Sequence, residues 1–411
     1  MISNCKSICM KFGQTLILLA TVAFLNQSIA QDYLHRVVVF SEGWSNWQTG
    51  EVMEPATLGV YDPGLQTFVV QDTLEDAGFV SDAVIYESSI YVAADGQVLR
   101  YDLNSFDLMA SAQAIGVRQL AILDGLIYLT RGDVDAAGMN LELDSYLMWL
   151  DLETLDPVGE LTVSSGPGYA TEGLVVHDEK LYIGVNNAFD WGNEVGFMGQ
   201  YDPITDEYVE WDLGMEGKNP IHLFAQNDQI VSVNNRDYAS TSLSWKMIGD
   251  ETATTHVVAE TNAGCLAAVM TSDGQLRYQV SGEAAIRQAN QADLMSSTVW
   301  LDNVPEYYGM VIDPVSGDLY GAVTDYSTFG YVEIRTENGE LTGQFDCGVS
   351  PGVICMDVRS LVSACGLPSP LQKKPSQWTF DALGRQILGV SSGYRFEVDE
   401  HGRKRVIILN Q

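Results

Sequence analysis

The stretch DAVIYESSIYVAADGQVLRYDLNSFDLMASAQ, residues 82–113, contains four short strands in succession. Residues 82–86, 89–92, 97–103 and 107–113 alternate apolar with polar side chains and are rich in β-branched and aromatic residues, which is typical of half-buried strands. Glu87-Ser88 separates the first two strands, and such a short turn joins antiparallel neighbours. The stretch therefore predicts one four-stranded antiparallel sheet.

The same cassette occurs seven times along the chain. The third strand of each copy carries a landmark pair, and successive pairs lie 40 to 51 residues apart. A period of about 40–50 residues with four strands per unit is the signature of a β-propeller. We therefore predict an all-β fold with a seven-bladed β-propeller over residues 31–365. The landmark pairs are Tyr61-Asp62, Tyr101-Asp102, Leu150-Asp151, Tyr201-Asp202, Trp245-Lys246, Ile286-Arg287 and Val332-Glu333.

The two ends of the repeat predict how the ring closes. The first strand, residues 36–40, has no inner strand before it, and the apolar strand at 352–358 follows the last complete copy. If residues 352–358 pair with the N-terminal strand, both chain ends share one blade and the ring has no free edge. We therefore expect this strand to supply the inner strand of the first blade.

Residues 1–30 are typical of a secretory signal peptide. Lys6 and Lys11 precede an apolar run at 16–25, and Ser28-Ile29-Ala30 places small residues at −3 and −1 of a cleavage site. No later segment is apolar enough to span a bilayer. We expect an exported protein, extracellular or on the outer cell surface, with the periplasm as the alternative.

Four cysteines follow the signal segment, and export permits disulfides. Cys347, Cys355 and Cys365 cluster where the ring closes, while Cys265 lies apart. One bridge near the closure and small buried thiols are both compatible with this pattern. The sequence alone leaves the connectivity open.

The charge is strongly acidic. Residues 31–370 hold 12 Lys/Arg against 51 Asp/Glu. A body with this excess of negative charge repels nucleic acid and anionic membrane surfaces. We therefore expect no nucleic acid partner, no membrane insertion and a monomeric protein kept soluble by its charge.

A segment rich in Pro, Ser and Lys, 366–377, predicts a linker to a small separate β-unit at 378–411. This tail resembles the C-terminal sorting signal of type IX secretion cargo over its 34 residues, roughly half of a full sorting domain. The resemblance implies surface export through that machinery, and a plain stabilising hairpin is the alternative. It rests on Asp381-x-x-Gly384-Arg385, the Gly393-Tyr394 strand and the basic run 403–405 before the last strand.

The repeat region resembles the YncE-like surface propellers of diderm bacteria over nearly all of 33–360. The resemblance implies the propeller fold, and some members of that group bind cobamides or other small ligands beside outer-membrane transporters. The segments that carry it are Phe40-Ser41-Glu42-Gly43-Trp44, 58–63, Val117-Arg118-Gln119-Leu120, Thr171-Glu172-Gly173-Leu174 and 181–183.

The long loops predict where a binding site lies. In a propeller the loops after the second and fourth strands emerge on one face, and here those loops are long and rich in aromatic and amide residues. Aromatic faces offer contact area, and Arg and amide groups add directional hydrogen bonds. The ligand-binding candidates are Trp44, Trp47, Arg118, Arg131, Tyr169, Glu172, Asn186, Asn187, Trp191, Asn234, Asn235, Arg236, Tyr238, Tyr307, Tyr308 and Tyr326.

These loops favour a protein that binds a small ligand, a glycan or a protein partner without catalysis. A deep pocket lined by Trp44, Arg118, Trp191 and Arg236 would favour a small ligand, and a flat aromatic rim a glycan or protein. The alternatives are an adhesive surface protein and a hydrolase or lyase with carboxylates at the channel mouth. The carboxylates for that chemistry are Glu172, Asp190, Asp237 and Asp325.

The sequence gives little support for a cofactor. Asp133-x-Asp135-x-x-Gly138 with Asp144 has only partial calcium-loop spacing, because Ala137 occupies the fifth position. The five histidines are dispersed, and none shares a metal-ligand spacing. We expect no cofactor, with Ca²⁺ at this loop as the weaker alternative, and we predict no catalytic or metal-binding residue.

Overall fold

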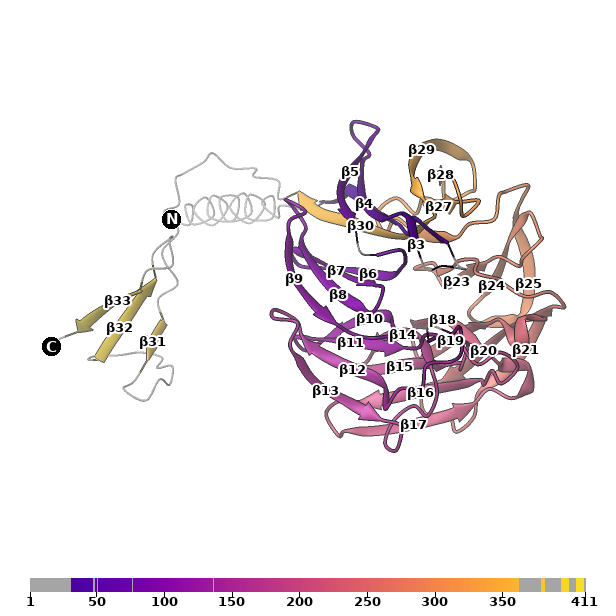
Figure 1. Ribbon diagram of the computed structural model, residues 1–411, viewed down its shortest axis with the longest axis horizontal. Helices are drawn as coiled ribbons and strands as arrows, with labels where there is room; N and C mark the ends of the chain where they lie inside the picture. The colour runs from indigo at the N-terminus through magenta and orange to yellow at the C-terminus, as the bar shows by residue number, and fades with distance from the viewer. Residues whose placement is uncertain are drawn as a thin grey trace, which may run out of the picture. The chain divides into compact units, whose positions relative to one another are not determined.

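The computed structural model describes residues 31–46, 49, 51–75, 77–135 and 137–361, and the strands 378–380, 393–398 and 404–409. Residues 32–359 form one compact unit, which contains seven four-stranded antiparallel sheets. Figure 1 shows these sheets arranged around a common centre, with β9 (Leu108–Gln113), β13 (Pro157–Thr162), β17 (Glu207–Asp212), β21 (Thr254–Ala259) and β25 (Asp293–Asp302) at the periphery. The predicted seven-bladed β-propeller is confirmed.

Each blade consists of an inner, a second, a third and an outer strand. From blade 1 to blade 7, the inner strands are β30 (Pro351–Leu361), β6 (Val80–Tyr86), β10 (Val117–Leu123), β14 (Thr171–His177), β18 (Pro220–Gln226), β22 (Ala268–Met270) and β26 (Gly309–Ile312). The second strands are β1 (Gln31–Ser41), β7 (Ser89–Ala94), β11 (Leu126–Arg131), β15 (Lys180–Val185), β19 (Gln229–Asn234), β23 (Gln275–Tyr278) and β27 (Leu319–Val323).

The third strands are β4 (Ala56–Asp62), β8 (Gln97–Asp102), β12 (Ser145–Asp151), β16 (Phe197–Asp202), β20 (Thr241–Met247), β24 (Ala285–Asn290) and β28 (Phe329–Arg335). All seven landmark pairs of the sequence lie on these strands, as predicted. The outer strands not yet given are β5 (Thr67–Leu74) in blade 1 and β29 (Leu341–Val349) in blade 7.

The ring closes as the sequence predicts. Blade 1 has the strand order β30-β1-β4-β5, so its inner strand comes from the C-terminal end of the propeller and its second strand from the N-terminal end. The backbone N–H of Glu42 donates to the Ser350 carbonyl oxygen at 2.9 Å, next to this pairing. Both ends of the propeller are thereby tied into one sheet, which completes the ring.

The aspartate of the landmark pair has a structural task. Asp102 Oδ1 accepts hydrogen bonds from the backbone N–H groups of Asn104 and Ser105, both at 2.8 Å. Asp62, Asp151 and Asp202 make the same pair of bonds to the residues two and three positions later. Such bonds fix the turn between the third and outer strands, and they explain why the Asp recurs.

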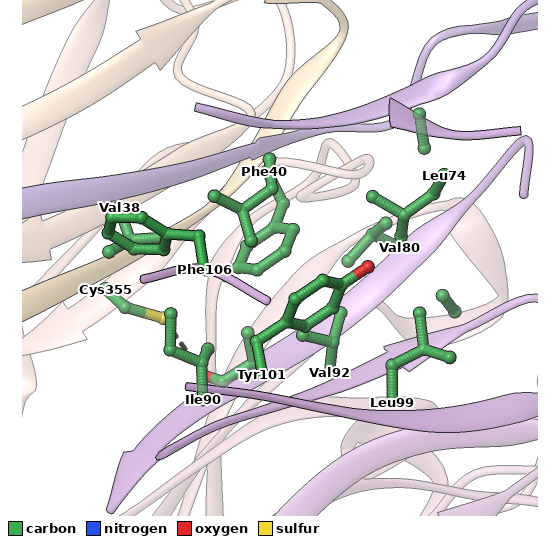
Figure 2. Packing of buried hydrophobic residues seen from close by; sticks show 14 of the residues in the cluster. Val38, Phe40, Leu74, Val80, Ile90, Val92, Leu99, Tyr101, Phe106 and Cys355 are labelled. Carbon is green, nitrogen blue, oxygen red and sulfur yellow. Dashed lines mark hydrogen bonds between the residues drawn. The ribbon is translucent and has the colours of Figure 1, made fainter. Parts of the chain in front are cut away.

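Apolar side chains from neighbouring blades form the core between them. Between blades 1 and 2, Val38 and Phe40 of β1 pack with Ile90 and Val92 of β7 (Figure 2). Where blade 7 meets blade 1, the rings of Tyr61 and Phe345 stack at 4.0 Å. Stacked rings bury a large apolar area, so they stabilise the last interface of the ring.

Three of the cysteines are free thiols, so no bridge joins Cys265, Cys347 and Cys355. Cys347 and Cys355 are buried in the blade cores, and the Cys355 thiol donates to the Ala83 carbonyl oxygen at 3.2 Å. These two behave as small buried hydrophobes, which was one of the two alternatives. Cys365 lies outside the described residues.

Two small sheets accompany the propeller. The segment after the second strand of blade 1 contains a hairpin of β2 (Trp44–Asn46) and β3 (Glu51–Glu54), which was not predicted from the sequence. The predicted C-terminal β-unit forms a three-stranded antiparallel sheet of β31 (Trp378–Phe380), β32 (Gly393–Val398) and β33 (Lys404–Leu409). The signal segment 1–30, the linker 366–377 and the Asp381–Arg385 element lie outside the described residues. Within the described part, no helix has the length and apolar character needed to cross a bilayer.

Candidate functional site

Four consecutive inner strands carry a β-bulge at their first residues. The register of β6, β10, β14 and β18 shifts by one residue there, between Val80 and Asp82 in β6 and between Val117 and Leu120 in β10. A bulge adds an unpaired residue and changes the direction of the side chains around it. The polar residues Asp82, Arg118, Glu172 and His222 all lie at these bulges, on the same end of the inner strands.

A cavity of about 650 Å³ lies at this end of the inner strands. The first residues of all seven inner strands contribute to its wall, so it occupies the mouth of the propeller channel. The loops after the second and fourth strands supply the rest. The polar and aromatic lining residues are Glu42, Phe79, Ser81, Asp82, Arg118, Gln119, Glu172, Phe189, Trp191, Asn219, His222, Asn235, Tyr238, Cys265 and Tyr308.

An ion pair between Arg118 and Glu172 crosses from blade 3 to blade 4 in this wall. Arg118 Nη2 and Nε donate to Glu172 Oε1 at 2.8 and 3.1 Å, and the two side chains are 20% and 14% exposed. The guanidinium carbon lies 5.1 Å from the Phe79 ring centroid and 5.3 Å from that of Phe189. Burial opposes the charge of Arg118, but the Glu172 carboxylate outweighs it and raises the Arg118 pKa. Arg118 is thus a fixed part of the wall whose charge is already neutralised.

Glu42 follows the second strand of blade 1 and is buried, and it accepts a hydrogen bond from the Tyr308 hydroxyl at 2.8 Å. Burial raises the pKa of Glu42 to about 8, although the Tyr308 bond lowers it in part. A Cβ on Gly352 would lie 2.8 Å from Tyr308 Cε1 and 3.0 Å from Glu42 Oε1, so only glycine leaves room for this pair. Glu42 therefore carries a proton at neutral pH and can itself donate a hydrogen bond.

Asp82 is the second carboxyl group of the cavity wall whose pKa is raised by burial. Burial raises its pKa to about 7, while the backbone N–H groups of Leu120 and Ala83, at 2.8 and 2.9 Å, lower it in part. His222 donates from Nε2 to the Leu266 carbonyl oxygen at 3.1 Å, and burial lowers its pKa. Near neutral pH His222 is neutral, Glu42 is largely protonated and Asp82 is close to its pKa, so this wall carries little net charge.

Aromatic residues form the rim of the cavity. The indole of Trp191 stacks on the Tyr238 ring with centroids 4.9 Å apart, and Trp191 is 70% exposed. Opposite in the wall, Tyr308 meets Tyr326 edge to face at 5.2 Å. Asn219 lies among these groups, fully buried, and neither amide atom has a hydrogen-bond partner of ordinary geometry among the described residues. The rim thus combines an accessible aromatic surface with a buried amide beside it.

The structure brings six of the sixteen candidate residues together in the cavity wall, and Tyr326 contacts one of the six. The six are Arg118, Glu172, Trp191, Asn235, Tyr238 and Tyr308. Of the four residues named for a deep pocket, Arg118 and Trp191 line it and Trp44 and Arg236 do not. Trp47 lies outside the described residues.

The other candidates lie outside this cavity, and several have clear structural contacts. Arg131 donates to the carbonyl oxygens of Ile115 and Ser145, and Asn234 is buried between Ser232, Ser242 and Ser244. Arg236 pairs with Glu216, and Tyr307 is buried with its hydroxyl on Glu333. Asn187 bonds within its own loop, and Trp44, Tyr169 and Asn186 are not among the lining residues.

Three of the four carboxylates considered for catalysis also lie outside the cavity lining. Asp190 accepts from Asn193, and Asp237 pairs with Lys218 at 3.2 Å. Asp325 caps a turn, and backbone hydrogen bonds lower its pKa to about 2. In the calcium-like loop, Asp133 and Asp135 accept backbone hydrogen bonds, and the described residues contain no cluster of three potential metal ligands.

Several residues of the wall were not predicted from the sequence, chiefly Glu42, Asp82, His222 and Phe189. A signal was present for Asp82 and His222, because both lie near the start of an inner strand, in the position of Arg118 and Glu172. Polar residues at the first positions of otherwise apolar inner strands point to the channel. Glu42 gave no such signal, since its role depends on Tyr308, 266 residues away.

The fold and this cavity define the class of the protein as a seven-bladed β-propeller with a ligand-sized pocket at one end of its channel. Two solved structures share the fold. A quinoprotein alcohol dehydrogenase-like protein from Bacteroides thetaiotaomicron aligns with a TM-score of 0.56 at 14% identity, covering 79% of each chain. Hydrazine synthase from Kuenenia stuttgartiensis aligns with a TM-score of 0.54 at 13% identity, covering 71% of this chain and 97% of that chain. No family model and no curated protein matches the sequence.

Proposed function

We propose that this propeller binds a small organic ligand in the cavity at the channel mouth, without transforming it. The main support for this proposal is that residues from all seven blades line one cavity of about 650 Å³. Ligand pockets typically measure about 300–1,000 Å³ and combine aromatic walls with a few convergent polar groups. The Trp191–Tyr238 stack and the groups around Glu42, Asp82 and Asn219 match that description.

The charges in the wall favour a neutral or cationic ligand over an anion. Among the described residues of the lining, Arg118 is the only Lys or Arg, and Glu172 already neutralises it through two hydrogen bonds. Glu42 and Asp82 can donate when protonated and accept when ionised. A ligand with hydroxyl, amide or amine groups and a flat face suits this set, which includes sugars and other small polar compounds.

Replacing Trp191 with alanine tests this site. We expect Trp191→Ala to weaken ligand binding by at least about tenfold, because hot-spot aromatics contribute about 2 kcal/mol or more. The thermal stability should change little, because Trp191 is 70% exposed. Phe329→Ala is the matched control, since Phe329 is 74% exposed and lies outside this cavity. Equal affinities of the two variants for a ligand bound by the wild type would contradict the site.

A specific observation favours a second function, a hydrolase or lyase. The cavity holds three acidic side chains in different environments: Glu42 with its raised pKa, Asp82, and Glu172 in an ion pair. Acid and base roles in one site need carboxyl groups whose environments differ. Conversion of the bound compound by the wild type, lost in Glu42→Gln, would favour this function over simple binding.

We also propose that the protein is exported and displayed at the cell surface. The support is the signal-like segment 1–30 and the resemblance of the three-stranded C-terminal unit to a type IX sorting signal. Deletion of residues 378–411 should leave the protein in the periplasm, measured by protease accessibility on intact cells. Normal surface display of the shortened chain would contradict this route.

A further inference from the structure

At one position of the second strand, blade 6 carries a charged side chain whose burial is energetically unfavourable. In blades 2, 3, 4 and 7 the equivalent second-strand residue is a buried tyrosine: Tyr91, Tyr128, Tyr182 or Tyr320. Each of these tyrosines is the register partner of an apolar residue of the inner strand. Blade 5 has Val231 there, and blade 6 has Arg277, paired with Val269. A core position that is apolar or aromatic in these other blades is thus occupied by a charged side chain.

The Arg277 side chain is poorly satisfied. It is 6% exposed, and Nε and Nη1 are buried without any hydrogen-bond partner among the described residues. Its guanidinium carbon lies 3.8 Å from the centroid of the Trp300 indole, which compensates the charge only in part. Burial lowers the pKa of Arg277, and Asp273 and Glu337 act against that shift. A buried guanidinium that lacks acceptors for two of its nitrogen atoms is rare and unfavourable in a folded protein.

Arg277 lines a second cavity, of about 670 Å³, at the other end of the inner strands. It opens between blades 5, 6 and 7, where the inner strand β22 has only three residues, Ala268–Met270. The apolar part of the wall includes Leu223, Phe224 and Ile312.

The charges of this cavity limit what it can accept. In the part of the lining that the structure describes, Arg277 is the only basic side chain, and three carboxylates accompany it: Asp273, Asp313 and Glu337. Asp313 is committed to the Val315 N–H and the Ser316 hydroxyl, and Asp273 accepts from the Thr271 hydroxyl. A simple anion would meet this acidic surround, whereas a ligand carrying both charges would complement it.

We propose that the cavity around Arg277 binds a small zwitterion of the α-amino acid type with an apolar side chain. The ligand carboxylate pairs with the Arg277 guanidinium, which is suited to planar carboxylates. The ammonium group faces the carboxylates of Asp273 and Glu337, and the side chain lies against Leu223, Phe224 and Ile312. This site is independent of the channel-mouth cavity and of the function proposed for it.

Three matched probes test the proposal on the purified protein by isothermal titration calorimetry. L-leucine carries both charges, 4-methylpentanoate lacks the amine, and 3-methylbutylamine lacks the carboxylate. We expect leucine to bind at least about tenfold more tightly than either of the other two. Phenylalanine and methionine extend the test to larger apolar side chains.

Arg277→Tyr is the decisive variant, because it restores the residue found in four other blades and should fold at least as stably as the wild type. We expect it to lose leucine binding while its melting temperature is maintained. Absence of binding by all three amino acids at about 10 mM would overturn the proposal. Unchanged leucine binding by Arg277→Tyr would also overturn it, as would equal binding of 4-methylpentanoate.

Discussion

Arg118→Ala should lower the free energy of unfolding by about 2–4 kcal/mol, because it leaves the Glu172 carboxylate without its partner in the cavity wall. Breaking a fully buried ion pair costs about 3–5 kcal/mol, and the expected value is lower because the side chains remain 20% and 14% exposed. Glu172→Ala should lower the free energy of unfolding by a similar or smaller amount, because the Phe79 and Phe189 rings still interact with the Arg118 charge. Urea unfolding with an unchanged m-value measures the effect.

The double variant distinguishes the interaction between Arg118 and Glu172 from the contribution of each side chain alone. Arg118→Ala with Glu172→Ala should cost clearly less than the sum of the two single changes, because neither charge is then left alone. Arg287→Ala provides a control, since the Arg287–Glu283 pair has similar geometry at 2.7 Å but lies outside this wall and is more exposed. Equal costs for Arg118→Ala and Arg287→Ala, or simple additivity in the double variant, would contradict the account of a buried, coupled pair.

Glu42→Gln should raise stability at pH 8 relative to the wild type by on the order of a few kcal/mol. The pKa of Glu42 rises from its ordinary 4.5 to about 8 in the folded protein. Below pH 4.5 both states are protonated, so the wild type has no disadvantage. Between pH 4.5 and 8 the unfolded chain loses the proton while the folded chain keeps it, so the stability of the wild type falls steadily against the variant.

The difference between wild type and Glu42→Gln, measured by urea unfolding from pH 4 to 9, isolates this carboxyl from the other titrating groups. Tyr308→Phe serves as the companion variant. This change removes the hydroxyl whose hydrogen bond lowers the Glu42 pKa, so the pH range over which stability falls should extend to higher pH. A wild-type-minus-variant difference that is flat with pH would contradict the buried, protonated state of Glu42.

The fold could be predicted because each blade repeats the same local sequence pattern. The landmark pair is repeated since Tyr61, Tyr101 and Tyr201 fill blade cores while the following Asp caps a turn. The closing strand could be found because the repeat leaves residues 36–40 without an inner partner. The β2–β3 hairpin could not, since short strands such as Trp44–Asn46 have too few residues for a pattern.

The candidate site could be predicted only in part. The long loops predict the face on which the cavity lies, and Arg118, Trp191 and Tyr238 line that cavity. Asn234 and Tyr307 were misleading, because a buried amide or phenol bonded within a blade looks the same in sequence as one that faces a ligand. The Arg277 departure was visible in the repeat, but its significance depends on burial and on the cavity beside it.

The most direct measurement of the central claim is a thermal-shift screen of small polar compounds and glycans on wild type and Ala188→Trp side by side. Ala188 lines the channel-mouth cavity and is partly exposed, so tryptophan there should fill the space without breaking a blade. A ligand at about 100 times its Kd stabilises the folded state by about 2.7 kcal/mol. We predict compounds that raise the melting temperature of the wild type and leave Ala188→Trp unchanged. Stabilisation of both proteins alike, or of neither, would contradict a ligand site at the channel mouth.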